Sequence, residues 1–81
     1  MDENMKKAYD ARHKQAYRAA FEILEALFPP EDTVEYWEHA HEHMKEIYNK
    51  YRDNPALRFL IVANENYLGY VVKEIKEHGD G

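Results

Sequence analysis

One short segment of the sequence concentrates histidine and carboxylate side chains. Residues 38–43 read Glu-His-Ala-His-Glu-His. On a helix, His39 and His43 lie one turn apart on the same face, a spacing that lets two imidazoles reach one metal ion. A dedicated site would need a fixed third or fourth ligand from another helix, and the sequence offers only exposed glutamates nearby. We therefore predict a weak metal site at His39 and His43, and no resident cofactor.

Other catalytic chemistries lack their residues. The chain has no cysteine and no serine, and Thr33 is its single threonine, which excludes serine and cysteine nucleophiles, thiol redox chemistry and Cys-type zinc sites. Only three glycines occur, too few for a phosphate-binding loop. General acid and base catalysis needs titratable groups in a cleft that excludes water, whereas the charged residues here fall mainly on outward faces. We expect a protein without enzymatic activity.

Two proline signals divide the chain into three helical segments. Pro29-Pro30 ends the first, and Asn54-Pro55 supplies an N-cap and a first helical residue for the third. Asp32 and Glu35 form a capping-box pattern before the second, and Pro30 as its first helical residue is an equally good alternative. Apolar residues recur at steps of three and four in each segment. The sequence predicts an all-α, antiparallel up-down-up three-helix bundle, a single domain over 1–81, with helices at about 3–28, 32–52 and 55–78 and a stop at Gly79.

The third helix carries a second apolar face. A chain of 81 residues buries only about 60% of its unfolded surface, so its core is small. On this face, Phe59, Ala63, Asn66 and Tyr70 lie more than about 100° from the centre of the core stripe. One exposed aromatic residue is unremarkable on a protein surface, but a row of them favours a seam for a second copy of the chain. The predicted interface residues are Phe59, Val62, Ala63, Asn66 and Tyr70.

Polar residues interrupt the predicted core stripes. His13, His41 and Asn64 fall on those stripes among several tyrosines. Buried imidazole and amide groups need hydrogen-bond partners, which tyrosine hydroxyls can supply. We predict a buried polar network that fixes helix register. The alternative is a small-ligand pocket lined by His and Tyr, which a bundle this thin rarely encloses.

The net charge of −5 is unevenly distributed. Residues 1–20 carry five basic and three acidic side chains, whereas residues 21–46 carry eight acidic side chains against one lysine. An acidic surface steers a basic protein partner and makes nucleic-acid binding unlikely. The predicted acidic face consists of Asp32, Glu35, Glu38, Glu42 and Glu46.

The favoured function is therefore a small protein-interaction module, a homodimer whose acidic second helix meets a basic partner. Three alternatives remain open, and the third of them is a metal-binding helical bundle. The first is a nucleic-acid-associated protein that uses the basic residues of the first helix, and the second is a DNA-mimicking inhibitor that uses the acidic row. No window is apolar enough for a membrane span, and the charged start lacks the order of a signal peptide, so a cytoplasmic location is expected. In the nucleic-acid alternative, the basic residues of the first helix are Lys6, Lys7, Arg12, Lys14 and Arg18.

Overall fold

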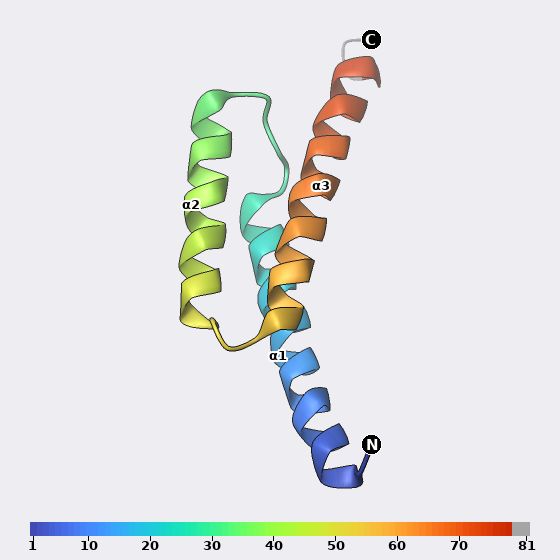
Figure 1. Ribbon diagram of the computed structural model, residues 1–81. Helices are drawn as coiled ribbons and strands as arrows, with labels where there is room; N and C mark the ends of the chain where they lie inside the picture. The colour runs from blue at the N-terminus through green and yellow to red at the C-terminus, as the bar shows by residue number, and fades with distance from the viewer. Residues whose placement is uncertain (79–81) are drawn as a thin grey trace.

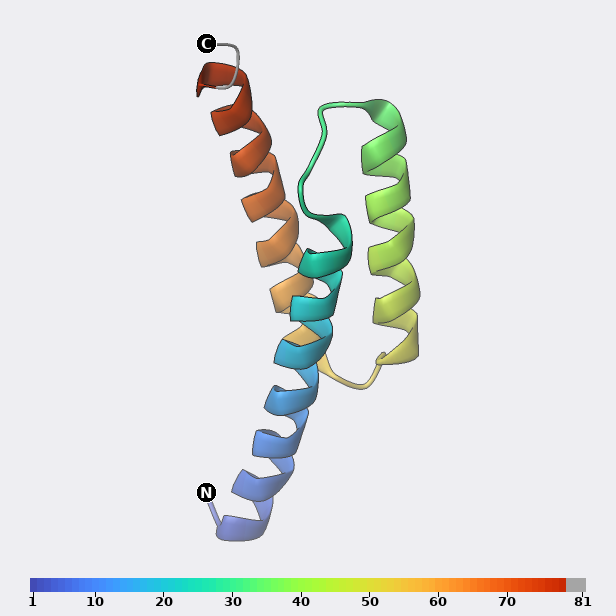
Figure 2. The same cartoon turned by 180° about the vertical axis from the view of Figure 1, so that it is seen from behind.

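Three helices account for nearly all of the chain that the computed structural model describes, residues 1–78 (Figure 1). They are α1 (Glu3–Leu27), α2 (Val34–Lys50) and α3 (Pro55–His78), and residues 1–78 contain no strand. The prediction of an all-α three-helix bundle is confirmed. Both views show the chain reversing direction between α1 and α2 and again between α2 and α3 (Figures 1 and 2). The predicted stop at Gly79 lies outside the described residues.

Side-chain caps begin the first two helices. The Asp2 carboxylate accepts a hydrogen bond of 2.7 Å from the backbone N–H of Met5. The Thr33 hydroxyl accepts one of 3.0 Å from the N–H of Tyr36. The predicted capping role of Asp32 is wrong, because the extended backbone at Thr33 puts that hydroxyl, one residue later, over the free N–H groups. As a result, α2 starts at Val34, two residues later than predicted.

The helix ends follow the proline signals closely. α1 ends at Leu27, just before Pro29-Pro30, and α3 begins at Pro55 as the sequence predicts. α2 ends at Lys50, two residues earlier than predicted. There the N–H of Tyr51 is shared between two preceding carbonyls, which tightens the chain into the turn toward α3.

The core lies where all three helices overlap. Ile23 of α1 and Leu57 and Leu68 of α3 are completely buried. Two clusters form around them, with half-buried residues such as Ile47 and Ile61 packed against both. Small residues let α1 approach its neighbours closely in one of these clusters. The buried residues of the two clusters are Ile23, Leu27, Ala40, Met44 and Leu68 in the first, and Ala16, Ala19, Ala20 and Leu57 in the second.

Two asparagine amides join α3 to the backbone of α1. Asn54 is 1% exposed, and its side-chain N–H₂ donates to the Arg12 carbonyl at 2.9 Å and to Gln15 Oε1 at 3.0 Å. Asn64 is half-buried and donates to the Ala20 carbonyl at 2.9 Å. Asn54 stands directly before α3 as predicted, but the predicted side-chain cap is wrong, because its amide nitrogen binds α1 and its Oδ1 accepts no hydrogen bond within residues 1–78. A buried amide group that donates across to a neighbouring helix fixes how the two segments are aligned along their lengths.

The first half of α1 extends beyond the other two helices. Residues 1–15 are all exposed, and Figure 1 shows this end of α1 projecting below the turn that joins α2 to α3. The molecule is consequently elongated, 55 × 23 × 15 Å along its principal axes. We call residues 3–15 the N-terminal arm. The predicted burial of His13 is wrong, because only the first turn of α3 reaches this end of the arm, and His13 stays exposed beside Ala56 and Leu60.

Within residues 1–78, no helix has the length and hydrophobicity needed to cross a bilayer.

Candidate functional site

The second apolar face of α3 is exposed in the structure. Phe59 is 74% exposed, Tyr70 58% and Val62 52%, and Ala63 and Asn66 are exposed as well. We call these five residues the seam. They were predicted together from helical spacing, and α3 presents all of them to solvent.

Tyr70 also makes a polar contact at the edge of the seam. Its hydroxyl donates to Glu74 Oε1 at 2.7 Å, one turn further along α3. This hydrogen bond, together with the negative charge of Glu74, raises the pKa of Tyr70 above its usual value. The ring of Tyr70 is thereby held along the helix surface while one face stays open to solvent.

α1 adds aromatic residues to the same side of the molecule, which the sequence analysis missed. Tyr17 is 66% exposed and Phe21 61%. Tyr17 and Phe59 line one depression of about 330 Å³ between α1 and α3. The signal was present in the sequence, since positions 13, 17, 21, 24 and 28 form a stripe beside the core stripe of α1. It was hidden because the two stripes merge into one wide apolar arc.

The acidic face is exposed over its whole length. All five predicted residues are exposed, and four of them lie on α2. Asp32 precedes α2 and forms an ion pair with Lys76 of α3. Within residues 1–78, neither ion pair involves Glu35, Glu38, Glu42 or Glu46. These four carboxylates give α2 a negative surface, and Lys45 and Lys50 are the only cations of Lys or Arg type on that helix.

His39 and His43 lie side by side, as their spacing predicts. Their ring centroids are 6.4 Å apart and the ring planes differ by 19°. Residues 1–78 contain no group of three His, Cys, Asp or Glu side chains arranged to hold a metal ion. The two imidazoles thus form half of a coordination shell, without a third protein ligand among the described residues.

His41 lies at the edge of the bundle and not in its core. Its side chain is 55% exposed, and Nε2 lies 3.0 Å from Glu65 Oε1 of α3. The predicted burial of His41 is therefore wrong. The stripe of α2 is wider than the surface that α1 and α3 cover, so its outermost residue stays at the rim.

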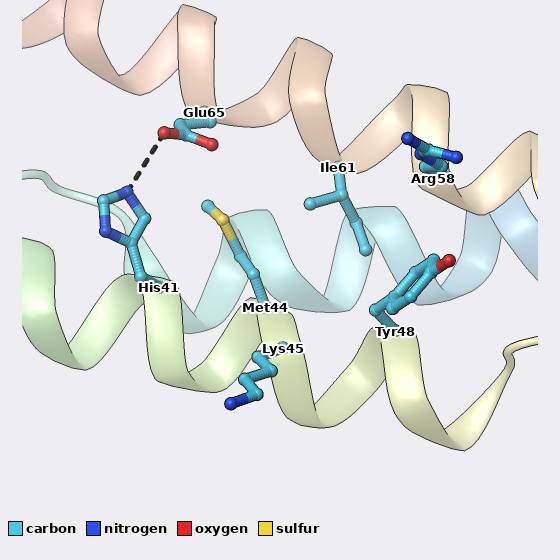
Figure 3. A pocket seen from close by; sticks show the side chains of 7 residues that line it. All are labelled: His41, Met44, Lys45, Tyr48, Arg58, Ile61 and Glu65. Atoms are coloured by element: carbon cyan, nitrogen blue, oxygen red, sulfur yellow. Dashed lines mark hydrogen bonds and ion pairs between the residues drawn. The ribbon is translucent and has the colours of Figure 1, made fainter.

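A pocket of about 460 Å³ opens between α2 and α3 beside this pair (Figure 3). Met44 and Tyr48 of α2 and Ile61 of α3 supply its apolar surface. His41 and Glu65 lie at one end of it, and Arg58 and Tyr48 lie at the other (Figure 3). The pocket is an open groove between two helices, not a cavity enclosed by the bundle.

Tyr36 is a titratable group used for structure. Its hydroxyl donates to the Leu27 carbonyl at 2.7 Å and so closes the C-terminal end of α1 against α2. Burial, with a smaller contribution from the charge of Glu31, raises the pKa of Tyr36. This residue was predicted neither as a core polar group nor as a site residue.

Comparison with protein-family models, with curated proteins and with solved structures finds no match to this chain.

Proposed function

We propose that this protein is a non-enzymatic interaction module that self-associates through the seam of α3 and the adjoining aromatic residues of α1. The observation that carries the proposal is the exposed apolar surface shared by these two helices. Phe59, Tyr70, Tyr17 and Phe21 are each more than half exposed. Large exposed apolar patches on small proteins mark interaction sites.

The size of this surface supports a stable contact. Six aromatic side chains of α1, of α3 and of the residue that follows α1 are between 47% and 74% exposed. At roughly 200 Å² for each ring, they expose about 700 Å² in total, and Tyr17 and Phe59 are the two that line one depression. The six residues are Tyr17, Phe21, Phe28, Phe59, Tyr67 and Tyr70.

The seam also has room for close approach. A Cβ added at Gly69 would meet no atom within 4 Å, so that glycine is not needed for packing inside the chain. Ala63, which lies between Phe59 and Tyr70 along α3, keeps the surface between these two rings low, and Gly69 borders the seam beside Val62. Two copies related by a two-fold axis would bury the same patch on each, as homodimers usually do.

We further propose that the acidic face of α2 attracts a basic protein partner in the cytoplasm. Glu35, Glu38, Glu42 and Glu46 form no ion pair within residues 1–78. An unpaired row of one charge raises association rates with a partner of opposite charge, and salt screens this effect over about 10 Å.

The seam is tested by the oligomeric state of a double variant. Replacing Phe59 and Tyr70 by Glu should convert a dimer to a monomer in light scattering without changing helix content, because both side chains lie outside the core. Val34→Glu is the matched control, since Val34 is a 70% exposed apolar residue on α2, away from the seam. An unmodified protein that is monomeric at high micromolar concentration would contradict self-association.

The acidic face is tested by charge reversal in two variants that have the same net charge. Glu35, Glu38 and Glu42 are changed to Lys in one variant, and Glu22, Glu25 and Glu77 in a control. Association with a Lys- and Arg-rich peptide should slow markedly only in the first variant. Equal slowing would reduce the face to a net-charge effect, and tight, salt-sensitive binding of duplex DNA by the unmodified protein would favour the nucleic-acid alternative.

A further inference from the structure

The pocket between α2 and α3 combines an apolar floor with charged ends. Met44 is only 4% exposed and forms the floor together with Ile61. Figure 3 shows Ile61 between the two ends, with the Tyr48 ring below Arg58 at one end. Its volume of about 460 Å³ falls in the range of small-molecule sites, about 300–1,000 Å³.

The two ends of the pocket differ in charge. Glu65 lies beside His41, so the carboxylate at that end already has a partner. Arg58 at the opposite end belongs to neither ion pair of residues 1–78. Lys45 adds a second positive charge at the rim, with its ammonium turned away from α3 (Figure 3). An unpaired cationic end is unusual on this acidic protein, and it complements an anion.

We propose that this pocket binds a small organic anion with an apolar body, of the class of medium-chain carboxylates. The Arg58 guanidinium offers parallel N–H donors that match the two oxygens of a carboxylate. The Tyr48 hydroxyl lies at the same end and can donate a further hydrogen bond. The apolar body then extends over Ile61 and Met44.

The opposite end fixes the orientation of the ligand. An anion placed beside Glu65 would be repelled by its carboxylate, so the negative group belongs at Arg58. Met44 suits an apolar chain of variable shape, because its unbranched thioether side chain adapts to its contacts. The pocket and the seam lie on neighbouring faces of α3 that meet where Arg58 and Val62 stand one turn apart, while Ile61 lies at least about 100° around the helix from every seam residue.

The test compares two probes with the same apolar chain, octanoate and 1-octanol. Binding is followed through the NMR signals of the Met44 methyl and the Ile61 methyl groups. Octanoate should bind about tenfold more tightly than octanol, the effect expected of one charge-assisted hydrogen bond, and should shift both methyl signals. Acetate, which has the charge without the chain, should bind more weakly than octanoate.

Two variants then test whether Arg58 supplies the positive charge that binds the carboxylate. Arg58→Gln should bring octanoate binding down to the level of octanol, while circular dichroism confirms that the exposed substitution leaves the fold intact. Lys73→Gln removes an exposed cation of the same helix outside the pocket and should leave octanoate binding unchanged. Equal binding of the two probes, full octanoate binding by the Arg58 variant, or shifts confined to the rings of Phe59 and Tyr70 would each overturn the proposal.

Discussion

Residues 3–15 and 16–27 of α1 form one continuous helix with the same spacing of apolar residues, but only the second half is packed. Met5 and Tyr9 of the N-terminal arm are 51% and 44% exposed, whereas Ile23 is fully buried. α2 has 17 residues against 25 in α1, so it cannot cover the whole length of α1. α3 is nearly as long, but it starts beside Arg12 and continues past the end of α1. Helical periodicity predicts which face is apolar, and the offset between helices decides how much of that face is buried.

The largest effect is expected when one apolar side chain in each half of α1 is truncated to alanine and the two losses of stability are compared. Ile23→Ala should lower the free energy of unfolding by about 2–5 kcal/mol, because it opens a cavity among residues that cannot close it. Met5→Ala removes a side chain of similar size from the arm and should change it by less than about 0.5 kcal/mol. Urea denaturation at low micromolar concentration measures both. A large loss for Met5→Ala would mean that something covers the arm in solution.

The second effect concerns the boundary between the halves, where Asn54 binds the backbone at Arg12. Asn54→Ala should destabilise the protein by about 1–3 kcal/mol, because the Arg12 carbonyl loses a buried donor. Asn49→Ala, at an exposed asparagine of α2, is the control and should stay within about 0.5 kcal/mol. If both variants unfold at the same urea concentration, the bridge from Asn54 does not fix the position of α3 along α1.

These residues show what the sequence could and could not predict. The proline signals and the step of three and four gave the three helices and the exposed seam, because both depend on local geometry. Asn54 was predicted as a cap because its neighbour is proline, and only the packed helices reveal α1 within reach of its amide. His13 and His41 were predicted to be buried because they lie on the apolar stripes. That prediction failed because a stripe does not show where the neighbouring helix ends. A ligand pocket lined by His and Tyr was the alternative interpretation of the sequence, and His41 and Tyr48 do line the groove, but its position and the part of Arg58 depend on how far apart α2 and α3 lie.

The third effect lies at the other end of the packed half and depends on pH. Tyr36→Phe removes the hydrogen bond to the Leu27 carbonyl and should cost about 1 kcal/mol at pH 7. The pKa of Tyr36 is raised in the folded state, so its contribution is complete below the unfolded value of 10.0 and is lost as pH rises through the higher folded value. The unmodified protein should therefore lose stability above about pH 10 more steeply than the Phe variant. Parallel pH profiles would contradict this role.

The smallest effect compares two N-caps that have similar hydrogen bonds. Thr33→Ala should cost about 1 kcal/mol, because α2 is packed and any loss at its start is felt by the whole fold. Asp2→Ala removes a cap of 2.7 Å from the arm, and its global cost should stay below about 0.5 kcal/mol, since the first turns can unwind without disturbing the core. The loss should appear instead as faster amide hydrogen exchange near Met5, with exchange near Ile23 unchanged. Because the two caps differ mainly in what lies behind them, equal global costs would show that the arm and the packed half unfold as one cooperative unit.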